Sequence, residues 1–316
     1  MAKSTTIDFF YFPVRIGRAR YAFNLGGPLM RKQTFLYSTL EDLDLSMTFY
    51  SNENNSSTKA TLLYFHGGGL LYGTRNDLPE VYCELLVENG YNLLAVDYPL
   101  APEVKLPTII SCLTEAIDWF LKNYQTTLGL KKPDYFLFGR SAGGFLSYLL
   151  SARHLLPEQK GLISFYGYYD LTNPSFNQPS TYYNQFPKIA PLTAQALICP
   201  KPTAEVSINE RFSLYLSGRQ FGNWLSYLVS TPSEKETFSL TDTELTALPP
   251  TFLAHSSADQ DVPVETSRIA NTKIPDVTYE EVEKLPHDFD GDITKSEGLQ
   301  VYQALIVWLD KTLATS

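Results

Sequence analysis

One serine of the chain lies between glycines in FLFGRSAGGF, residues 136–145. Apolar residues precede it and helix-like residues follow, which predicts a strand, a sharp turn at Ser141 and a helix. Gly139 and Gly143 leave the room that such a turn needs. A hydroxyl at the start of a helix faces free N–H groups and the positive end of the helix dipole, which favour anionic intermediates. Ser141 is therefore a candidate nucleophile, although an ordinary strand-to-helix connection fits the same pattern.

Three consecutive glycines follow another apolar run, in YFHGGGLLYG at residues 64–73. Backbone N–H groups without side-chain cover are suitable donors to the oxyanion of an acyl-transfer reaction. A flexible turn or a phosphate loop is the alternative, but neither G-x-x-x-x-G-K-[ST] nor G-x-G-x-x-G is present. We expect the N–H groups of Gly68, Gly69 and Ala142 to form an oxyanion hole.

The order of three motifs carries a family resemblance. HGGG, then DYPLAPE at Asp97–Glu103, then GRSAGG resembles the hormone-sensitive-lipase-like branch of the α/β-hydrolases. The resemblance extends from about Ala60 onward and is looser before that residue and in the central insertion. It implies an α/β-hydrolase fold, with a mostly parallel eight-stranded sheet flanked by helices. It also implies ester hydrolysis by a serine, an acid and a histidine.

The chain order of these groups in the fold, serine then acid then histidine, selects the base, and the resemblance implies the acid. Only one histidine, His287 in KLPHDFDGD, follows a sufficiently late strand. The other three lie too early: His66, His154 and His255. The family's acid position falls on Asp259, while Asp261, two residues later, stays an alternative. Asp259 is preferred because a position at a strand end holds a histidine more rigidly than a later loop position.

Two residues depart from the family pattern, and one acidic run needs an interpretation. Arg140 stands where the family usually has aspartate, and Ser256 where it usually has glycine. Both bear on local hydrogen bonding and substrate choice rather than on the reaction type.

The run Asp288–Asp292 lacks the glycine and glutamate that a calcium loop would need at Ile293 and Leu299, so we interpret it as a solvated loop. No zinc-ligand spacing is present, and neither a metal nor an organic cofactor is expected.

The surrounding elements alternate between apolar runs and amphipathic segments from Ala60 onward, which is typical of a parallel sheet covered by helices. A leading strand pair over 32–51 and a surface turn at 52–58 come first. The predicted strands then span 61–66, 91–98, 135–138, 161–169, 250–257 and 277–284. The predicted helices span 77–90, 109–120, 142–150 and 299–313.

The alternation stops between residues 170 and 248, where proline, asparagine and tyrosine are frequent. Only residues 211–228 look clearly helical there. We expect a cap inserted into a single hydrolase domain that spans 1–316. Its aromatic residues could line a substrate entrance, and a packed accessory subdomain is an equally good interpretation.

Composition excludes several classes of function. With 316 residues, of which 44% are hydrophobic, the chain can form one large domain. Its 25 basic and 34 acidic residues give a net charge of −9, and without a basic run nucleic acid is not an expected partner. No segment has the form of a signal peptide or a membrane span. We therefore expect the mature protein to be the whole chain and to have no stable membrane association. Three cysteines without C-x-x-C spacing suggest a reducing, cytoplasmic setting.

Together these features predict a serine carboxylesterase for short-chain esters of small molecules. Ser141 attacks the carbonyl, His287 takes the proton, and Asp259 orients the imidazole. A peptidase or arylamide hydrolase of the same fold is the nearest alternative, and a hydrolase-fold binding protein without turnover is another. The sequence leaves open whether the chain forms a homo-oligomer.

Overall fold

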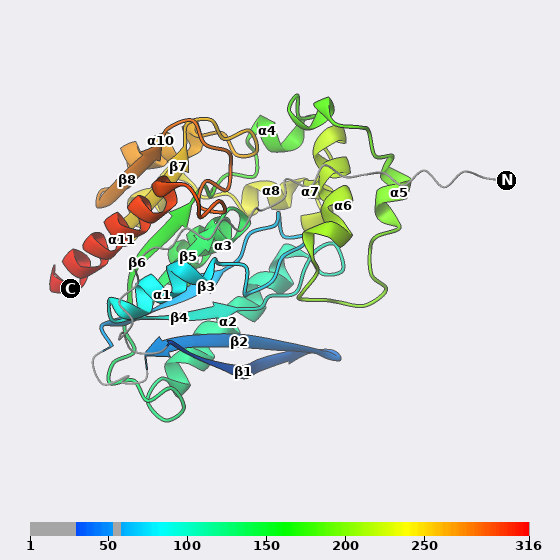
Figure 1. Cartoon of the computed structure of the whole chain (residues 1–316). Helices are drawn as coiled ribbons and strands as arrows, with labels where there is room; N and C mark the ends of the chain where they lie inside the picture. Colours follow the sequence, from blue (N-terminus) through cyan, green and yellow to red (C-terminus); the bar gives the residue numbers. More distant parts are fainter. Residues whose placement is uncertain (1–29, 53–57, 316) are drawn as a thin grey trace.

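The computed structural model describes residues 30–52 and 58–315, and Figure 1 shows a central sheet with helices on both faces. The eight strands have the spatial order β1-β2-β4-β3-β5-β6-β7-β8. Strand β2 pairs antiparallel with β1 and β4, and every later neighbour is parallel. The strands are β1 (Met30–Leu40), β2 (Leu43–Asn52), β3 (Ala60–Phe65), β4 (Tyr91–Val96), β5 (Tyr135–Arg140), β6 (Gln159–Phe165), β7 (Thr251–Ser256) and β8 (Val277–Val282). The mostly parallel eight-stranded sheet is confirmed.

Five helices, of 9 to 20 residues, cover the two faces of this sheet. They are α1 (Glu80–Glu88), α2 (Leu106–Asn123), α3 (Ala142–Arg153), α10 (Glu265–Lys273) and α11 (Ser296–Thr315). Helices α1 and α11 share one apolar cluster with the sheet, while α2, α3 and α10 share the other. Every residue of β3 is buried: Leu63 and Phe65 face the α2–α3 side, whereas Leu62 and Tyr64 face the α1–α11 side. Burial on both faces explains why these strands are continuous apolar runs.

The chain between β6 and β7, residues 166–250, is called the intervening segment; it holds one helix of 14 residues and several helices of four or five residues. Its helices are α4 (Pro174–Asn177), α5 (Pro191–Gln195), α6 (Ile208–Phe221), α7 (Leu225–Leu228), α8 (Ser233–Thr237) and α9 (Asp242–Thr246), with a 3₁₀ turn at Tyr183–Gln185. Figure 1 shows α5, α6 and α7 beyond one end of the central strands. The Trp224 Nε1 group donates to the Gly69 carbonyl just after β3, 3.0 Å away, so that end is the carboxyl end of the strands.

Some predicted boundaries were wrong. The helix expected over 211–228 is two helices, because Gly222 ends α6 with a left-handed φ of 68°. The strand expected to continue to Tyr169 ends at Phe165, where Tyr166 turns with φ 40°. The strand expected to continue to Lys284 ends at Val282, and Lys284 has φ 60°. The leading strand pair is confirmed, whereas the surface turn at 52–58 lies mostly outside the described residues.

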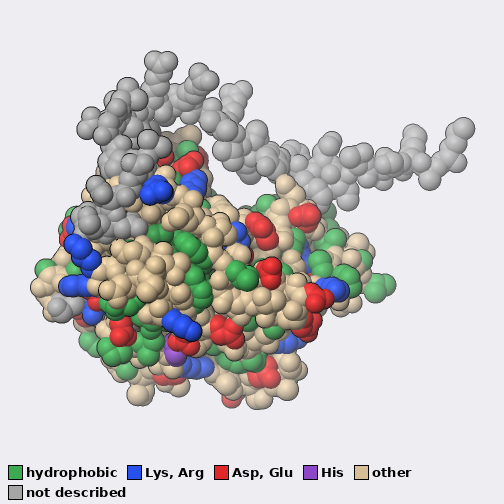
Figure 2. All heavy atoms as spheres, turned by 90° about the horizontal axis from the view of Figure 1, so that it is seen from below, with side chains coloured by type: hydrophobic (Ala, Val, Ile, Leu, Met, Phe, Trp, Pro, Cys, Tyr) green, Lys and Arg blue, Asp and Glu red, His purple; other side chains and the backbone are tan. Residues whose placement is uncertain are grey.

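Two expectations from the sequence concern membrane-spanning segments and the charge of the surface. Within the described ranges, none of the helices combines the length and the apolar character needed to cross a membrane. On the face in Figure 2, basic and acidic side chains are interspersed. This distribution agrees with the absence of a basic run in the sequence.

Candidate active site

Ser141 lies at the apex of the turn between β5 and α3, with φ 53° and ψ −117°. A residue other than glycine rarely adopts a positive φ, so the surrounding backbone must hold it there. A Cβ atom at Gly139 would lie 2.0 Å from the backbone of Gly143, and one at Gly143 would lie 1.9 Å from the Phe65 carbonyl oxygen. The two glycines are therefore required for the turn to close against β3.

Three side chains that are distant in the sequence meet at this turn. The His287 Nε2 atom lies 2.8 Å from the Ser141 Oγ atom. On the opposite side of the ring, His287 Nδ1 lies 2.6 Å from the Asp259 Oδ2 atom. A carboxylate partner fixes the proton on Nδ1 and leaves the Nε2 lone pair to accept the serine proton. Because all three residues follow carboxyl ends of strands, the parallel sheet brings them together.

The Asp259 carboxylate is fully buried and accepts several hydrogen bonds. Its Oδ1 atom accepts from the backbone N–H groups of Asp261 and Val262 at 2.8 and 2.9 Å. The Nε2 atom of His255 lies 2.9 Å from Oδ2, and this second histidine was not anticipated as a partner. Burial alone raises the pKa of Asp259, but the charges and hydrogen bonds of His287 and His255 outweigh it and hold the pKa well below its usual range. The group is thus a carboxylate.

His287 is surrounded by negative charge. Burial lowers the pKa of its imidazole, but the charge and hydrogen bond of Asp259, together with the charges of Asp261 and Asp288, raise the pKa to about 9. The Tyr166 ring packs edge-on against the imidazole, with centroids 4.7 Å apart. The imidazolium form is therefore favoured beside these carboxylates.

The alternative acid, Asp261, lies on the other side of the imidazole. Its Oδ2 atom is 3.8 Å from His287 Nε2, and its oxygens accept hydrogen bonds from Tyr215 and Arg219. The structure thus brings Asp259, and not Asp261, to the Nδ1 atom.

The glycine run after β3 packs against the serine turn. Gly68 and Gly69 have φ 88° and 59°, and a Cβ atom at Gly68 would lie 1.9 Å from the Tyr72 carbonyl oxygen. A Cβ atom at Gly67 would lie 3.3 Å from Cβ of Ser141. Ala142 is the first residue of α3, so its N–H group has no partner within the helix. The predicted oxyanion donors thus belong to two backbone segments that pack against each other beside Ser141.

Arg140, the first departure from the family pattern, has a buried acidic partner. Its Nη2 atom lies 3.0 Å from Oδ1 of Asp290, and its Nε atom donates to the Tyr166 hydroxyl at 2.6 Å. Asp290 is fully buried and also accepts from the hydroxyls of Tyr166 and Tyr302, at 2.7 and 3.0 Å. The interpretation of Asp288–Asp292 as a solvated loop was therefore wrong for Asp290, because this carboxylate compensates a buried guanidinium.

Ser256, the second departure, connects two segments of the site. Its hydroxyl donates to the Leu285 carbonyl at 2.5 Å and accepts from the N–H groups of Leu285 and Ala258 at 3.1 and 3.3 Å. This hydroxyl thereby joins the end of β7 to the segment that leads into His287, which a glycine could not do.

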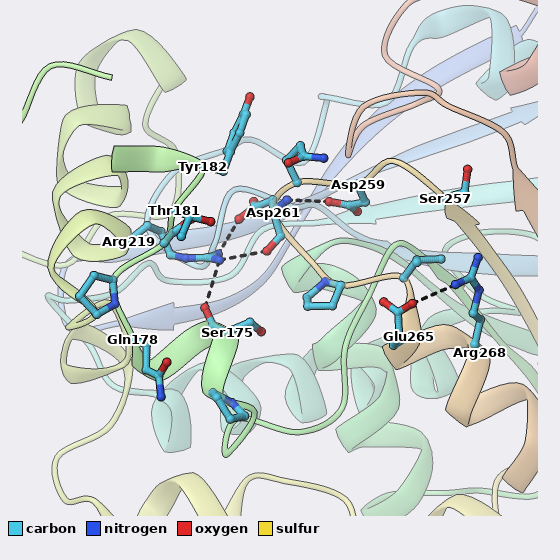
Figure 3. A pocket seen from close by; sticks show the side chains of 16 residues that line it. Ser175, Gln178, Thr181, Tyr182, Arg219, Ser257, Asp259, Asp261, Glu265 and Arg268 are labelled. Carbon is cyan, nitrogen blue, oxygen red and sulfur yellow. Dashed lines mark hydrogen bonds and ion pairs between the residues drawn. The ribbon is translucent and has the colours of Figure 1, made fainter. Parts of the chain in front are cut away.

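A cavity of about 460 Å³ opens at Ser141, and aromatic side chains line much of it. Six of them are Tyr72, Tyr166, Tyr182, Tyr183, Phe212 and Tyr215. A second cavity of about 450 Å³ lies beside it, where Figure 3 shows Arg219 directed at Asp261. In residues 30–52 and 58–315, no group of three or more histidine, cysteine or acidic side chains could hold a metal ion.

Comparisons with known proteins identify the family to which this fold belongs. A family model described as alpha/beta hydrolase fold matches residues 62–291. A solved structure of unknown function from Staphylococcus aureus has 30% sequence identity and a TM-score of 0.79, covering 89% of this chain and 99% of that one. An alpha/beta hydrolase superfamily protein from Enterococcus faecalis has 29% identity and a TM-score of 0.73, with the same coverage.

Curated relatives match over shorter segments. An esterase of Acinetobacter venetianus is 36% identical over 139 residues, which are 40% of this chain and 43% of that protein. A non-reducing polyketide synthase of Penicillium brasilianum is 27% identical over 218 residues, 62% of this chain but 8% of the synthase. The chain thus spans less than half the length of these relatives. The family match and the two structural likenesses extend over most of the chain, which belongs to the α/β-hydrolase family, in its hormone-sensitive-lipase-like branch.

Proposed function

We propose that the protein is a serine carboxylesterase in which Ser141, His287 and Asp259 form the catalytic triad. The observation that carries this proposal is the unbroken series of contacts from Asp259 through His287 to Ser141, at 2.6 and 2.8 Å. A nucleophile, a base and an orienting acid within hydrogen-bond distance are the requirements for acyl transfer through serine.

The reaction follows from these contacts. His287 Nε2 accepts the hydroxyl proton as Ser141 Oγ attacks the ester carbonyl, and Asp259 stabilises the resulting imidazolium. The N–H groups of Gly68, Gly69 and Ala142 donate to the tetrahedral oxyanion, each being worth on the order of 10² to 10³ in rate. The imidazolium then protonates the leaving alcohol. In the second half, His287 activates the water that hydrolyses the acyl-enzyme.

We further propose that residues 170–248 form a cap over the carboxyl end of the sheet. The Trp224 indole, which donates to Gly69, and the Tyr215 ring, which lines the cavity, both come from this segment and support the assignment. The exposed large apolar side chains of helix α6 are Ile208 and Phe221, at its two ends, so they do not form a long apolar face for seating on lipid. A cavity of about 460 Å³ at Ser141 fits a short acyl chain and a small alcohol better than a lipid chain.

The relatives support ester chemistry by their names. They include an esterase of Acinetobacter venetianus and an arylesterase of Saccharolobus solfataricus, 36% and 31% identical over 139 and 146 residues. We also propose a reducing, cytoplasmic setting, because Cys83, Cys112 and Cys199 are all free thiols. Trapping the thiols at cell lysis tests this setting, and a disulfide in the trapped protein would contradict it.

The function is tested with p-nitrophenyl acetate, butyrate, octanoate and palmitate, using the unaltered protein, Ser141→Ala and Ser147→Ala. Ser147 is the matched control, because its buried hydroxyl bonds, among the described residues, only to the Gly143 carbonyl of its own helix, 2.9 Å away. We expect turnover that falls with acyl length, disappears in Ser141→Ala and persists in Ser147→Ala. Undiminished activity in Ser141→Ala would refute the assignment, and hydrolysis of matched anilides alone would indicate an amidase.

A further inference from the structure

The Asp261 carboxylate is held by two side chains of helix α6. The Tyr215 hydroxyl lies 2.7 Å from Oδ1 and 2.9 Å from Oδ2 of Asp261. The Arg219 Nη1 atom lies 2.5 Å from Oδ1, and its Nη2 atom donates to the Asp261 backbone carbonyl at 3.0 Å. Figure 3 shows the Arg219 guanidinium directed at Asp261. Helix α6 thus fixes both the position and the rotation of this carboxylate.

Arg219 itself cannot readily move away. Its side chain is 3% exposed, and Nη2 also lies 3.4 Å from the Ser175 carbonyl oxygen. Four aromatic rings surround the guanidinium at 5.4 to 5.7 Å: Phe176, Tyr183, Tyr215 and Trp224. A guanidinium in such an aromatic cage is stabilised by the faces of the rings. The cage comes entirely from the intervening segment, so this segment determines where the positive charge lies.

The held carboxylate faces the atom of His287 that transfers the proton. Asp261 Oδ2 is 3.8 Å from His287 Nε2, whereas Ser141 Oγ is 2.8 Å from the same nitrogen. A distance of 3.8 Å is too long for a hydrogen bond but short enough for a strong charge interaction. The other groups that face the imidazole are Asp259 at Nδ1, the neighbouring carboxylate of Asp288, and the Tyr166 ring.

We propose that Asp261, Tyr215 and Arg219 are positioning residues that stabilise the His287 imidazolium while keeping its Nε2 proton directed at Ser141 and the leaving alcohol. The proposal rests on the function proposed above. Without its two donors, Asp261 would be free to rotate toward Nε2 and form a direct ion pair with His287. Such a pair would withdraw the base from the serine, because one N–H cannot donate well to both partners.

Two conservative replacements are expected to act in opposite directions. Asp261→Asn removes a negative charge near Nε2, so the pKa of His287 falls by about one unit, at the low end of the range for a close opposite charge. Tyr215→Phe keeps the ring but removes the hydroxyl that donates to both Asp261 oxygens, so the carboxylate gains freedom and the pKa of His287 rises. A purely structural defect would not produce shifts of opposite sign.

The experiment follows the ring protons of His287 by NMR titration and, in parallel, the acidic limb of kcat/KM for p-nitrophenyl butyrate. Tyr183→Phe is the matched control, because Tyr183 lines the same cavity and packs against Arg219, yet its hydroxyl makes no hydrogen bond to Asp261. We expect the pKa of His287 to fall in Asp261→Asn, to rise in Tyr215→Phe together with a reduced kcat, and to stay the same in Tyr183→Phe.

The proposal is overturned if the pKa of His287 shifts in the same direction in Asp261→Asn and Tyr215→Phe, or if it shifts in neither variant. Should one variant fail to fold, the sign of the shift in the other decides. The NMR titration needs no turnover, so it tests the positioning residues separately from the esterase function. Absence of hydrolysis in the unaltered protein would contradict the function alone.

Discussion

The buried ion pair of Arg140 and Asp290 gives a sharp test of how the site is assembled. Arg140 precedes the nucleophile, Asp290 lies three residues after His287, and their side chains are 9% and 0% exposed. Removing Asp290 leaves Arg140 with a second, more distant carboxylate, Asp77, whose Oδ2 atom lies 3.6 Å from Nη1, so part of the compensation remains. Removing Arg140 leaves the buried Asp290 charge uncompensated and costs about 3 to 5 kcal/mol. An unfolding entropy of roughly 2.1 cal/mol/K per residue over 316 residues converts this cost into a fall in Tm of about 5 to 8 °C.

The assay compares thermal unfolding of the unaltered protein with Arg140→Met, Asp290→Leu and the double variant. Arg140→Met is expected to lose about 3 to 5 kcal/mol, and Asp290→Leu less, because Asp77 still lies beside the guanidinium. The double variant is expected to lose less than the sum, because neither charge is then left alone. The Tyr166 and Tyr302 hydroxyls, which donate to Asp290, lose an acceptor in both variants that lack this carboxylate, so part of the cost remains.

Single losses below about 1 kcal/mol, or losses that simply add in the double variant, would refute the reasoning about this pair. A matched surface pair provides the control. Lys201 and Asp42 lie 3.0 Å apart with side chains 75% and 84% exposed, and Lys201→Met is expected to change Tm very little.

Two further predictions concern the reaction. Gly68→Ala places a Cβ atom against the Tyr72 carbonyl at a residue with φ 88°, so we expect kcat to fall by at least about 100-fold as an oxyanion donor is displaced. Gly129→Ala has the same kind of φ, 69°, with nothing within 4 Å of its Cβ, and should retain kcat; equal losses in both variants would contradict the assignment. His287 must be neutral to act as a base, and its pKa is raised to about 9, so kcat/KM should rise with pH through a limb near that value and fall about tenfold per unit below it. A limb near 6.5 in the pH–rate profile would show that the surrounding carboxylates do not act as described.

Local patterns allowed the fold and the triad candidates to be predicted. β3 and β5 are buried on both faces, so their apolar runs indicated parallel strands directly. The glycines beside Ser141 are required by the turn itself, which makes a sequence motif unavoidable at that place. His287 followed from the chain order of the three groups, and Asp259 from the acid position of the family that the sequence resembles.

Long-range partners could not be predicted in the same way. Arg140 was recognised only as a departure, because Asp290 lies 150 residues further along the chain and no local pattern connects the two. The contact between Tyr215 and Asp261 likewise joins residues 46 positions apart. The short helices of the intervening segment were missed because four or five residues, as in α4 and α8, do not complete a periodic pattern.

The most direct test of the central claim is covalent labelling with a p-nitrophenyl alkylphosphonate, read by mass spectrometry of intact protein and peptides. The phosphonate mimics the tetrahedral intermediate and reacts only with an activated serine. We predict one label per chain, on Ser141, no label in Ser141→Ala, and strongly slowed labelling in His287→Ala. A label on another residue, or an unlabelled Ser141 in the folded protein, would contradict the claim that this turn carries the nucleophile.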